Sequence, residues 1–91
     1  MKKLPRRDKM KIYGDLLSIL NESPNEKVVL TRVQLRINVP FDRLKTYISE
    51  LYELGLIQDE ASLKLTAKGK DYLKEYKMVL DFMNRMGLTY T

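Results

Sequence analysis

The sequence predicts one mainly α-helical domain that also carries a small β-hairpin. Three observations lead to this fold class. Apolar residues recur every three or four positions in four stretches, which is the period of a helix with one buried face. A short stretch typical of a hairpin lies before the last helix, and Pro and Gly residues separate the stretches. A chain of 91 residues is long enough for one core and too short for two.

The first helix is expected over residues 8–22. Its apolar positions run from Ile12 to Leu20 at helical spacing, which predicts one buried stripe. Pro24 stops this helix, because proline cannot continue a helix and disfavours helical backbone at the residue before it. The β-branched run at residues 27–30 then predicts a short edge strand.

Two further helices are expected, joined by a tight turn. Thr31 is predicted to cap the first, which ends near Ile37, because a threonine oxygen can accept a hydrogen bond from the first turn. Pro40 suits the first position of the second helix, over residues 40–54, and Gly55 ends it. The side chains expected in the core are Phe41, Leu44, Ile48 and Leu51. Those expected to face outward are Asp42, Arg43, Lys45, Thr46, Ser49 and Glu50.

A hairpin is expected next. Residues 56–59 and 63–65 predict two short strands, with residues 60–62 as the turn between them. Two helices joined by a tight turn and followed by a hairpin make a winged helix-turn-helix, in which the hairpin is the wing. Three short helices cannot close a core alone, so the hairpin and a last helix supply the remaining apolar faces.

The last helix is expected to begin after Thr66 as its cap and to end near Met86, with Gly87 beyond it. About 20 residues make a helix of roughly 30 Å. Gly69 lies early in this helix, and we expect close helix packing rather than a ligand to explain it. The expected divisions are a basic arm at 1–7, the winged helix-turn-helix domain at 8–66, the last helix at 67–87 and a tail at 88–91.

The composition excludes several classes of function. With no cysteine and no histidine, the chain can form no disulfide and lacks the usual zinc ligands and nucleophile–base pairs. We therefore expect no enzyme, no metal and no cofactor. No apolar run approaches the roughly 20 residues that span a bilayer, and the first residues lack the apolar stretch of a secretion signal. We expect the protein to begin at Met1 and to stay in the cytoplasm, associated with the nucleoid.

The net charge of +5 is concentrated at the N-terminus. Residues 1–11 hold six basic residues and one acid, whereas the other 80 residues balance at 11 of each. A basic arm on a neutral body is expected of a protein that binds nucleic-acid phosphates, and Arg6 and Arg7 are its candidate contacts. The alternative is a solvated tail that binds nothing.

Between residues 30 and 73 the sequence resembles a known family. The resembling segments are Thr31-Arg32, Asn38-Val39, Phe41, Leu44, Tyr47-Ile48, Leu51, Gly55-Leu56-Ile57, Leu65-Thr66-Ala67-Lys68-Gly69 and Tyr72-Leu73. Together they are similar to the small dimeric archaeal winged-helix DNA-binding proteins, the ten-kilodalton chromatin-type family of the Sulfolobales. The resemblance implies a homodimer whose C-terminal helices pair as an antiparallel coiled coil and display two winged-helix heads to DNA.

The sequence departs from that pattern at two places. Pro40 stands where a small polar cap is expected, which alters the contacts that the start of the recognition helix can make. The tip of the wing is acidic, at Asp59 and Glu60, so a deep groove contact by the wing is not expected.

The second helix of a helix-turn-helix lies in the major groove, with its N-terminal half against base edges. In that half, Arg43 is expected to reach guanine and Lys45 to reach a phosphate. Arg32, near the start of the preceding helix, is expected to contact a phosphate. The candidate DNA-binding residues are Arg6, Arg7, Thr31, Arg32, Arg36, Arg43, Lys45, Thr46, Ser49 and Lys64. The alternative for this set is a solvated surface.

The last helix carries more apolar residues than a small domain needs, in a heptad-like pattern. Its second half is expected to project past the body and to pair with a second copy. The candidate dimerisation residues are Tyr76, Val79, Leu80, Met83 and Met86. The alternative is that this helix folds back and covers the first helix.

Together these observations predict non-enzymatic binding of double-stranded DNA by a homodimer, as a transcriptional regulator or as an architectural chromatin protein. Because the body is neutral and the wing acidic, the main alternative is a winged-helix adaptor that binds another protein. A repressor that holds a small molecule between the heads and the last helices is a further alternative, although the sequence points to no ligand pocket.

Overall fold

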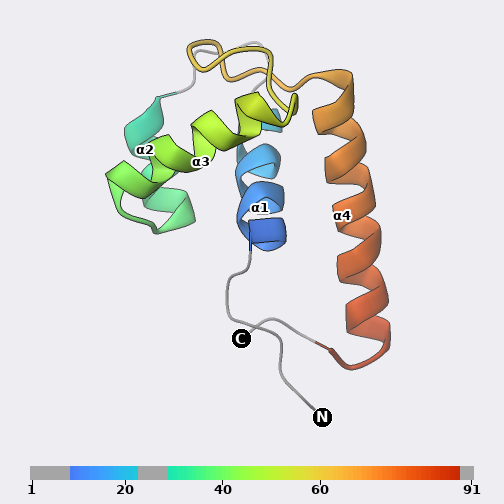
Figure 1. Ribbon diagram of the computed structural model, residues 1–91. Coiled ribbons are helices and arrows are strands. Elements are labelled where there is room, and N and C mark those ends of the chain that lie inside the picture. The colour runs from blue at the N-terminus through green and yellow to red at the C-terminus, as the bar shows by residue number, and fades with distance from the viewer. Residues whose placement is uncertain (1–8, 23–28, 89–91) are drawn as a thin grey trace.

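The computed structural model describes residues 9–22 and 29–88. The helices are α1 (Lys9–Asn21), α2 (Leu30–Ile37), α3 (Phe41–Glu53) and α4 (Ala67–Arg85). Figure 1 shows α1 standing between the α2–α3 pair and α4. Their bounds agree with the expected ones to within one or two residues. The four predicted helices are therefore confirmed.

The core lies where α1, α2 and α3 meet, beneath the loop that follows α3. The side chains with the least exposure are Leu16, Leu17, Ile37, Leu44, Leu51 and Ile57. Three of the four core residues expected on α3 are buried, but Phe41 is 39% exposed, so its expected burial is wrong. Phe41 is the first residue of α3 and lies at the edge of the core, where the neighbouring helices do not cover its ring.

The start of α2 differs from the expected one. Val29, in extended conformation, is its N-cap, and the Val29 carbonyl accepts from the N–H groups of Arg32 and Val33 at 3.0 and 3.2 Å. Thr31 therefore lies inside the first turn and is not the cap. Of the strand expected at residues 27–30, residues 27 and 28 lie outside the described part, and Leu30 is helical.

The turn between α2 and α3 is short and fixed at both ends. Asn38 has left-handed backbone, with φ of 58°, and its N–H bonds to the Gln34 carbonyl at 2.9 Å. Pro40 is the N-cap of α3 and not its first residue, one position from the expected place. Its carbonyl accepts from the Leu44 N–H at 3.0 Å. This turn sets how α3 crosses α2.

Gly55 ends α3, as the sequence predicts. With φ of +75° it reverses the chain, and its N–H bonds to the Tyr52 carbonyl at 2.9 Å. The Leu56 N–H bonds to the Leu51 carbonyl at 2.9 Å, and both leucines are buried. These two bonds satisfy carbonyl groups at the end of the helix and hold the loop at Leu56 close to Leu51.

The expected hairpin strands are not found among the described residues. One isolated antiparallel bridge joins Ile57 and Leu65, and the Gln58 N–H bonds to the Lys64 carbonyl at 2.8 Å. The Asp59 carboxylate binds the turn, accepting from the N–H groups of Ala61 and Ser62 and from the Ser62 hydroxyl. Leu63, buried at φ of 57°, takes a backbone conformation that a strand cannot continue. The wing is a compact loop for these reasons.

α4 begins and ends as the sequence predicts. The Thr66 hydroxyl accepts from the Gly69 N–H at 3.0 Å, which is the expected cap. At the other end Met86 is the C-cap, and Gly87 follows with φ of +76°. Gly69 lies against the carbonyl of Leu56, so close that any side chain there would collide with the backbone. Close packing therefore explains Gly69.

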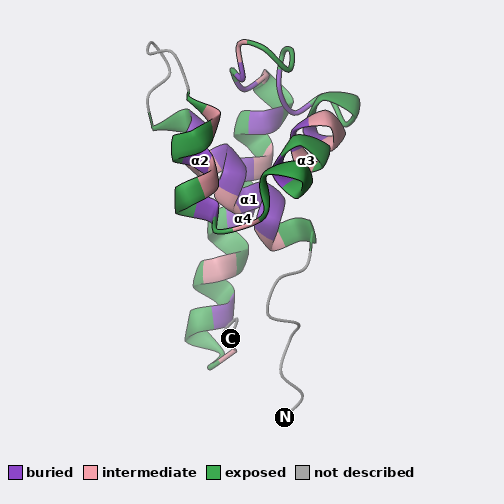
Figure 2. Cartoon of the chain, turned by 90° about the vertical axis from the view of Figure 1, so that its left-hand side faces the viewer, coloured by how far each residue is buried: buried purple, intermediate pink, exposed green. Residues whose placement is uncertain are grey.

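α4 packs along α1, so the alternative that it folds back over the first helix holds for part of its length. The Tyr76 ring lies against Gly14, where a side chain would collide with it, and the Tyr76 hydroxyl donates to Asp15 at 3.2 Å. Figure 2 shows the second half of α4 extending past the other helices, mostly exposed. The first half of α4 therefore covers α1, and the second half projects as expected.

We expect Gly69→Ala to destabilise the protein by about 2 kcal/mol, because the new methyl group must displace the Leu56 backbone. Thermal or urea unfolding followed by circular dichroism measures this difference. Lys70→Ala, at the exposed neighbouring position, serves as the control and should change stability by less than about 0.5 kcal/mol. Equal stability of the two variants would contradict the close approach.

Candidate nucleic-acid interface

One face of the molecule is formed by α2 and α3, on the side away from α4 (Figures 1 and 2). The outward orientation predicted for most of the candidate residues on these helices is confirmed. Thr31, Arg32, Arg36, Arg43, Lys45 and Thr46 are exposed, and Ser49 is half-buried. Within the part of the chain that the structure describes, Arg32, Arg43 and Lys45 form no ion pair. Their charges are thus available to a ligand.

The cations on α3 lie on opposite edges of its exposed surface. Successive residues of a helix are 100° apart, so Arg43 and Lys45 point about 160° from each other. Arg43 shares an edge with Tyr47 and Glu50, which contact α1. Lys45 lies on the other edge, where its ammonium is 5.9 Å from the centre of the Phe41 ring. A duplex that received α3 in its major groove would meet one cation on each side.

Arg36 differs from the other cations of this face. Its guanidinium forms a two-bond ion pair with the Glu22 carboxylate just after the end of α1. The pair raises the pKa of Arg36 and lowers the pKa of Glu22, in both cases first through the hydrogen bonds. The side chains are half exposed, so the contact ties α2 to α1 without being buried. Arg36 is therefore less available to DNA than its neighbours are.

Lys64 lies near one acid of the wing, Asp59. Lys64 is exposed. Its positive charge lowers the pKa of Asp59, but less than the hydrogen bonds to Asp59 do. The largest influence is the hydrogen bond from the Ser62 N–H, at 2.6 Å. The carboxylate that shapes the loop thus offsets the one cation of the wing.

A hydrogen-bond cluster fixes α3 to α1. The Glu50 carboxylate accepts from the Tyr13 hydroxyl at 2.6 Å and from the Lys9 ammonium at 3.1 Å. These bonds lower the pKa of Glu50, and burial followed by the bond to Glu50 raises the pKa of Tyr13. The Tyr13 ring also meets the Tyr47 ring edge-on, with centroids 6.4 Å apart. Glu50 is half-buried and holds α3 against α1, although it was expected to face outward.

Two of the candidate dimerisation residues are already covered within a single chain. Tyr76 and Met83 are each only 5% exposed, and Leu80 is half-buried. The other two candidates, Val79 and Met86, are exposed and lie on a neighbouring stripe of exposed apolar residues. This apolar stripe consists of Met78, Val79, Phe82 and Met86.

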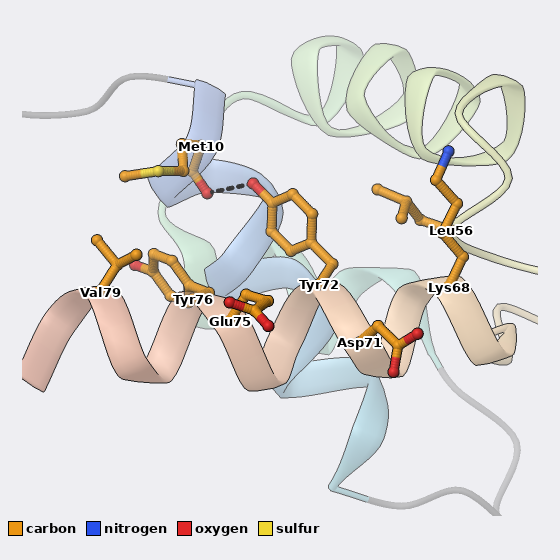
Figure 3. A pocket seen from close by; sticks show the side chains of 8 residues that line it. All are labelled: Met10, Leu56, Lys68, Asp71, Tyr72, Glu75, Tyr76 and Val79. Atoms are coloured by element: carbon orange, nitrogen blue, oxygen red, sulfur yellow. Dashed lines mark hydrogen bonds between the residues drawn. The ribbon is translucent and has the colours of Figure 1, made fainter.

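A pocket of about 300 Å³ opens between the start of α1 and α4, next to the apolar stripe. Figure 3 shows Tyr72, Tyr76 and Val79 along one wall with Met10 opposite them, and the Tyr72 hydroxyl donates to the Met10 carbonyl at 2.9 Å. Val79 belongs both to the pocket and to the stripe. The apolar surface of α4 thus continues into the body of the molecule.

Other kinds of site receive little support from the described residues. Among them, no three or more acidic side chains gather as metal ligands do. No helix of that part is long and apolar enough to cross a bilayer. Arg6 and Arg7, the candidate contacts of the arm, lie outside the described residues.

Sequence reasoning missed two features of these surfaces. The exposure of Phe41 has no sequence signal, because its spacing from Leu44 and Ile48 matches the buried stripe. Lys70, Lys74 and Lys77 form an exposed basic line along α4, and their spacing of four and three could have revealed it.

The comparisons agree with this geometry. A family model described as winged helix-turn-helix matches residues 6–84, which is most of the chain. No curated protein and no solved structure matches the chain significantly.

We expect Tyr13→Phe to lower the unfolding free energy by about 1 kcal/mol at neutral pH, because the Glu50 carboxylate loses the hydroxyl that donates to it. Since the pKa of Glu50 is lowered in the folded protein, this stabilisation is present above pH 4.5 and is lost as the pH falls through the lowered pKa. Urea unfolding at a series of pH values measures the difference from wild type.

Tyr47→Phe is the matched control, because it removes a hydroxyl from the neighbouring ring, which forms no such bond to a carboxylate of residues 9–22 or 29–88. Its effect should be small and the same at every pH. A Tyr13→Phe difference that did not shrink in acid would show that Glu50 is not the acceptor.

Proposed function

Because the chain belongs to the winged helix-turn-helix family, we propose that it binds double-stranded DNA as a homodimer, without catalysis. In this proposal α3 lies in the major groove, and the α4 helices join the two copies. The observation that carries the proposal is the face formed by α2 and α3, which bears Arg32, Arg43 and Lys45 exposed and without ion pairs among the described residues.

The dimensions of α3 suit this role. A helix with its side chains is about 10–12 Å across, and the major groove of DNA is about 12 Å wide. The turn from Asn38 to Pro40 and the Glu50 cluster hold α3 at both ends, so its exposed side is presented rigidly. Arg43 reaches guanine from one edge of the helix, while Lys45 reaches a phosphate from the other.

The remaining candidates contribute around this centre. Arg32 contacts a phosphate from α2, and Thr31, Thr46 and Ser49 add hydrogen bonds. Arg6 and Arg7 follow the DNA backbone from the arm. Arg36 and Lys64 have acidic neighbours, so we assign them smaller parts.

The homodimer is supported by the apolar stripe. Met78, Phe82 and Met86 are four residues apart and share one face of α4 with Val79. An exposed stripe of this kind on the projecting half of a helix is typical of an interaction surface. When two such helices run antiparallel and cross at Phe82, Met78 of each copy faces Met86 of the other. The stripe is thus complementary to itself, as a twofold interface requires.

This dimer leaves the proposed DNA face open. α2 and α3 lie on the other side of α1 from α4, so pairing through α4 covers neither of them. Two heads on one dimer can serve a regulator at chosen sites or an architectural protein along the duplex. The resemblance to small archaeal chromatin-type proteins favours the architectural role.

The second candidate function is a protein adaptor. The exposed acids Asp59 and Glu60 at the tip of the wing favour it, since they would repel DNA phosphates. A partner with a basic surface would fit this loop.

We expect the protein to bind a mixed-sequence duplex of about 30 base pairs at low salt, with an affinity that falls steeply as salt is raised. Replacing Arg32, Arg43 and Lys45 together by Ala should weaken binding at least tenfold and reduce the salt slope by about two for each head on the DNA, because Arg32 and Lys45 are the proposed phosphate contacts. Fluorescence anisotropy at several salt concentrations measures both quantities.

Lys70, Lys74 and Lys77 replaced together by Ala provide the matched control, because the same charge is removed from exposed positions on α4. This variant should keep most of the affinity. Equal losses in both variants would show that net charge acts and not the α2–α3 face. No binding by the wild type at low salt would make the adaptor the function to pursue.

We expect Phe82→Glu to convert the dimer to a monomer, because a carboxylate would be buried at the centre of the apolar stripe. Size-exclusion chromatography with light scattering measures the mass. Asn84→Glu adds the same charge to an exposed position away from the stripe and should remain dimeric. A monomeric wild type, or a dimeric Phe82→Glu protein, would contradict the interface.

A further inference from the structure

Phe41 is an exposed aromatic residue at the start of α3, the helix proposed to enter the major groove. It is 39% exposed, whereas Leu44, Ile48 and Leu51 on the same helix are buried. An exposed phenylalanine has no hydrogen-bonding group with which to satisfy water, unlike the exposed Tyr52 further along α3. Its ring therefore presents an apolar surface that can contact an apolar group of a ligand.

The position of Phe41 specifies where that group would lie. In a helix-turn-helix the N-terminal half of the second helix meets the base edges, and Phe41 is the first residue of α3. Lys45, one turn later, holds its ammonium 5.9 Å from the centre of the ring. Such a cation stays beside an aromatic ring by electrostatic attraction. A base pair that met the ring would thus lie beside a phosphate-binding lysine.

Base edges in the major groove offer few apolar groups. The C5-methyl of thymine is the one that distinguishes a base pair there, since the other groups are hydrogen-bond donors and acceptors. An aromatic ring against guanine or cytosine leaves those polar groups without partners. Against thymine, the ring removes one methyl group from water and leaves fewer polar groups unmet.

From these observations we propose that Phe41 contacts the C5-methyl of thymine in the major groove and gives the protein a preference for T·A pairs at that position. The inference rests on the proposed DNA binding and assigns one contact within it. Since burial of one methyl group is worth about fourfold in affinity, each such contact should contribute about that factor.

The test compares two duplexes that differ only in methyl groups. An A·T-rich duplex of about 30 base pairs is prepared with thymine or with uracil at every thymine position, which removes the methyl and keeps each hydrogen bond. Fluorescence anisotropy at fixed salt should show about fourfold tighter binding to the thymine duplex for each methyl contacted. Replacing cytosine by 5-methylcytosine in a G·C-rich duplex should raise the affinity by a similar factor.

Two variants assign the effect to the residue. Phe41→Ala should bind the thymine and uracil duplexes equally, with folding checked by circular dichroism. Tyr52→Ala, which removes the other exposed aromatic ring of α3, should keep the full discrimination. Discrimination that persists in Phe41→Ala would overturn the assignment.

The wild-type comparison alone can overturn the proposal, and it does not depend on how well a variant folds. Salt-dependent binding without discrimination between thymine and uracil overturns the methyl contact and leaves DNA binding standing. Absence of binding to every duplex at low salt overturns the proposed function itself. The two failures are therefore distinguishable.

Discussion

The positions of the α2–α3 face and of the apolar stripe of α4 both depend on α1. The apolar residues of α1 are spread too widely around the helix for one neighbouring helix to cover them. Leu16 and Leu17 are adjacent in sequence and point 100° apart, yet neither is exposed to solvent. α2 and α3 cover one side of α1, while α4 packs on the side marked by Gly14. A helix buried from two sides separates its neighbours into two outer faces. The face of α2 and α3 and the apolar stripe of α4 are therefore independent of each other.

The sequence predicted best those features that depend on a few neighbouring residues. The Thr66 cap and the reversals at Gly55 and Gly87 are short-range geometry, and all three are as expected. Thr31 failed as a cap because Val29 takes the extended conformation two residues earlier. The predicted hairpin strands are not found among the described residues for a different reason. The Asp59 turn and the left-handed backbone at buried Leu63 oppose strand pairing. The alternation of polar and apolar residues alone does not show that a turn competes with the hydrogen bonds between paired strands.

For the candidate interface, too, the features that depend on neighbouring residues were predicted best. Helical periodicity placed Arg43, Lys45 and Thr46 outward correctly, because periodicity fixes which side of a helix faces the core. The ion pair of Arg36 could not be predicted, because its partner, Glu22, is 14 residues away and comes near only when α1 and α2 pack. Likewise Tyr76 is covered by α1. Its hydroxyl donates to Asp15, which lies 61 residues earlier in the sequence. Long-range contacts of this kind decide which of the outward residues remain free.

The ion pairs also bear on how the two proposed activities relate. With Arg36 paired to Glu22 and Lys9 paired to Glu50, Arg32, Arg43 and Lys45 remain as the cations of each proposed DNA face. The two proposed phosphate contacts of one head, from Arg32 and Lys45, give a salt slope of only about 1.8, well below that of a protein making 6–10 contacts. Joining two heads doubles the number of contacts and raises the effective concentration of the second head near the DNA. In the proposed complex, dimerisation through α4 would thus supply much of the affinity that the charges of one head lack, and the basic arm would supply the rest.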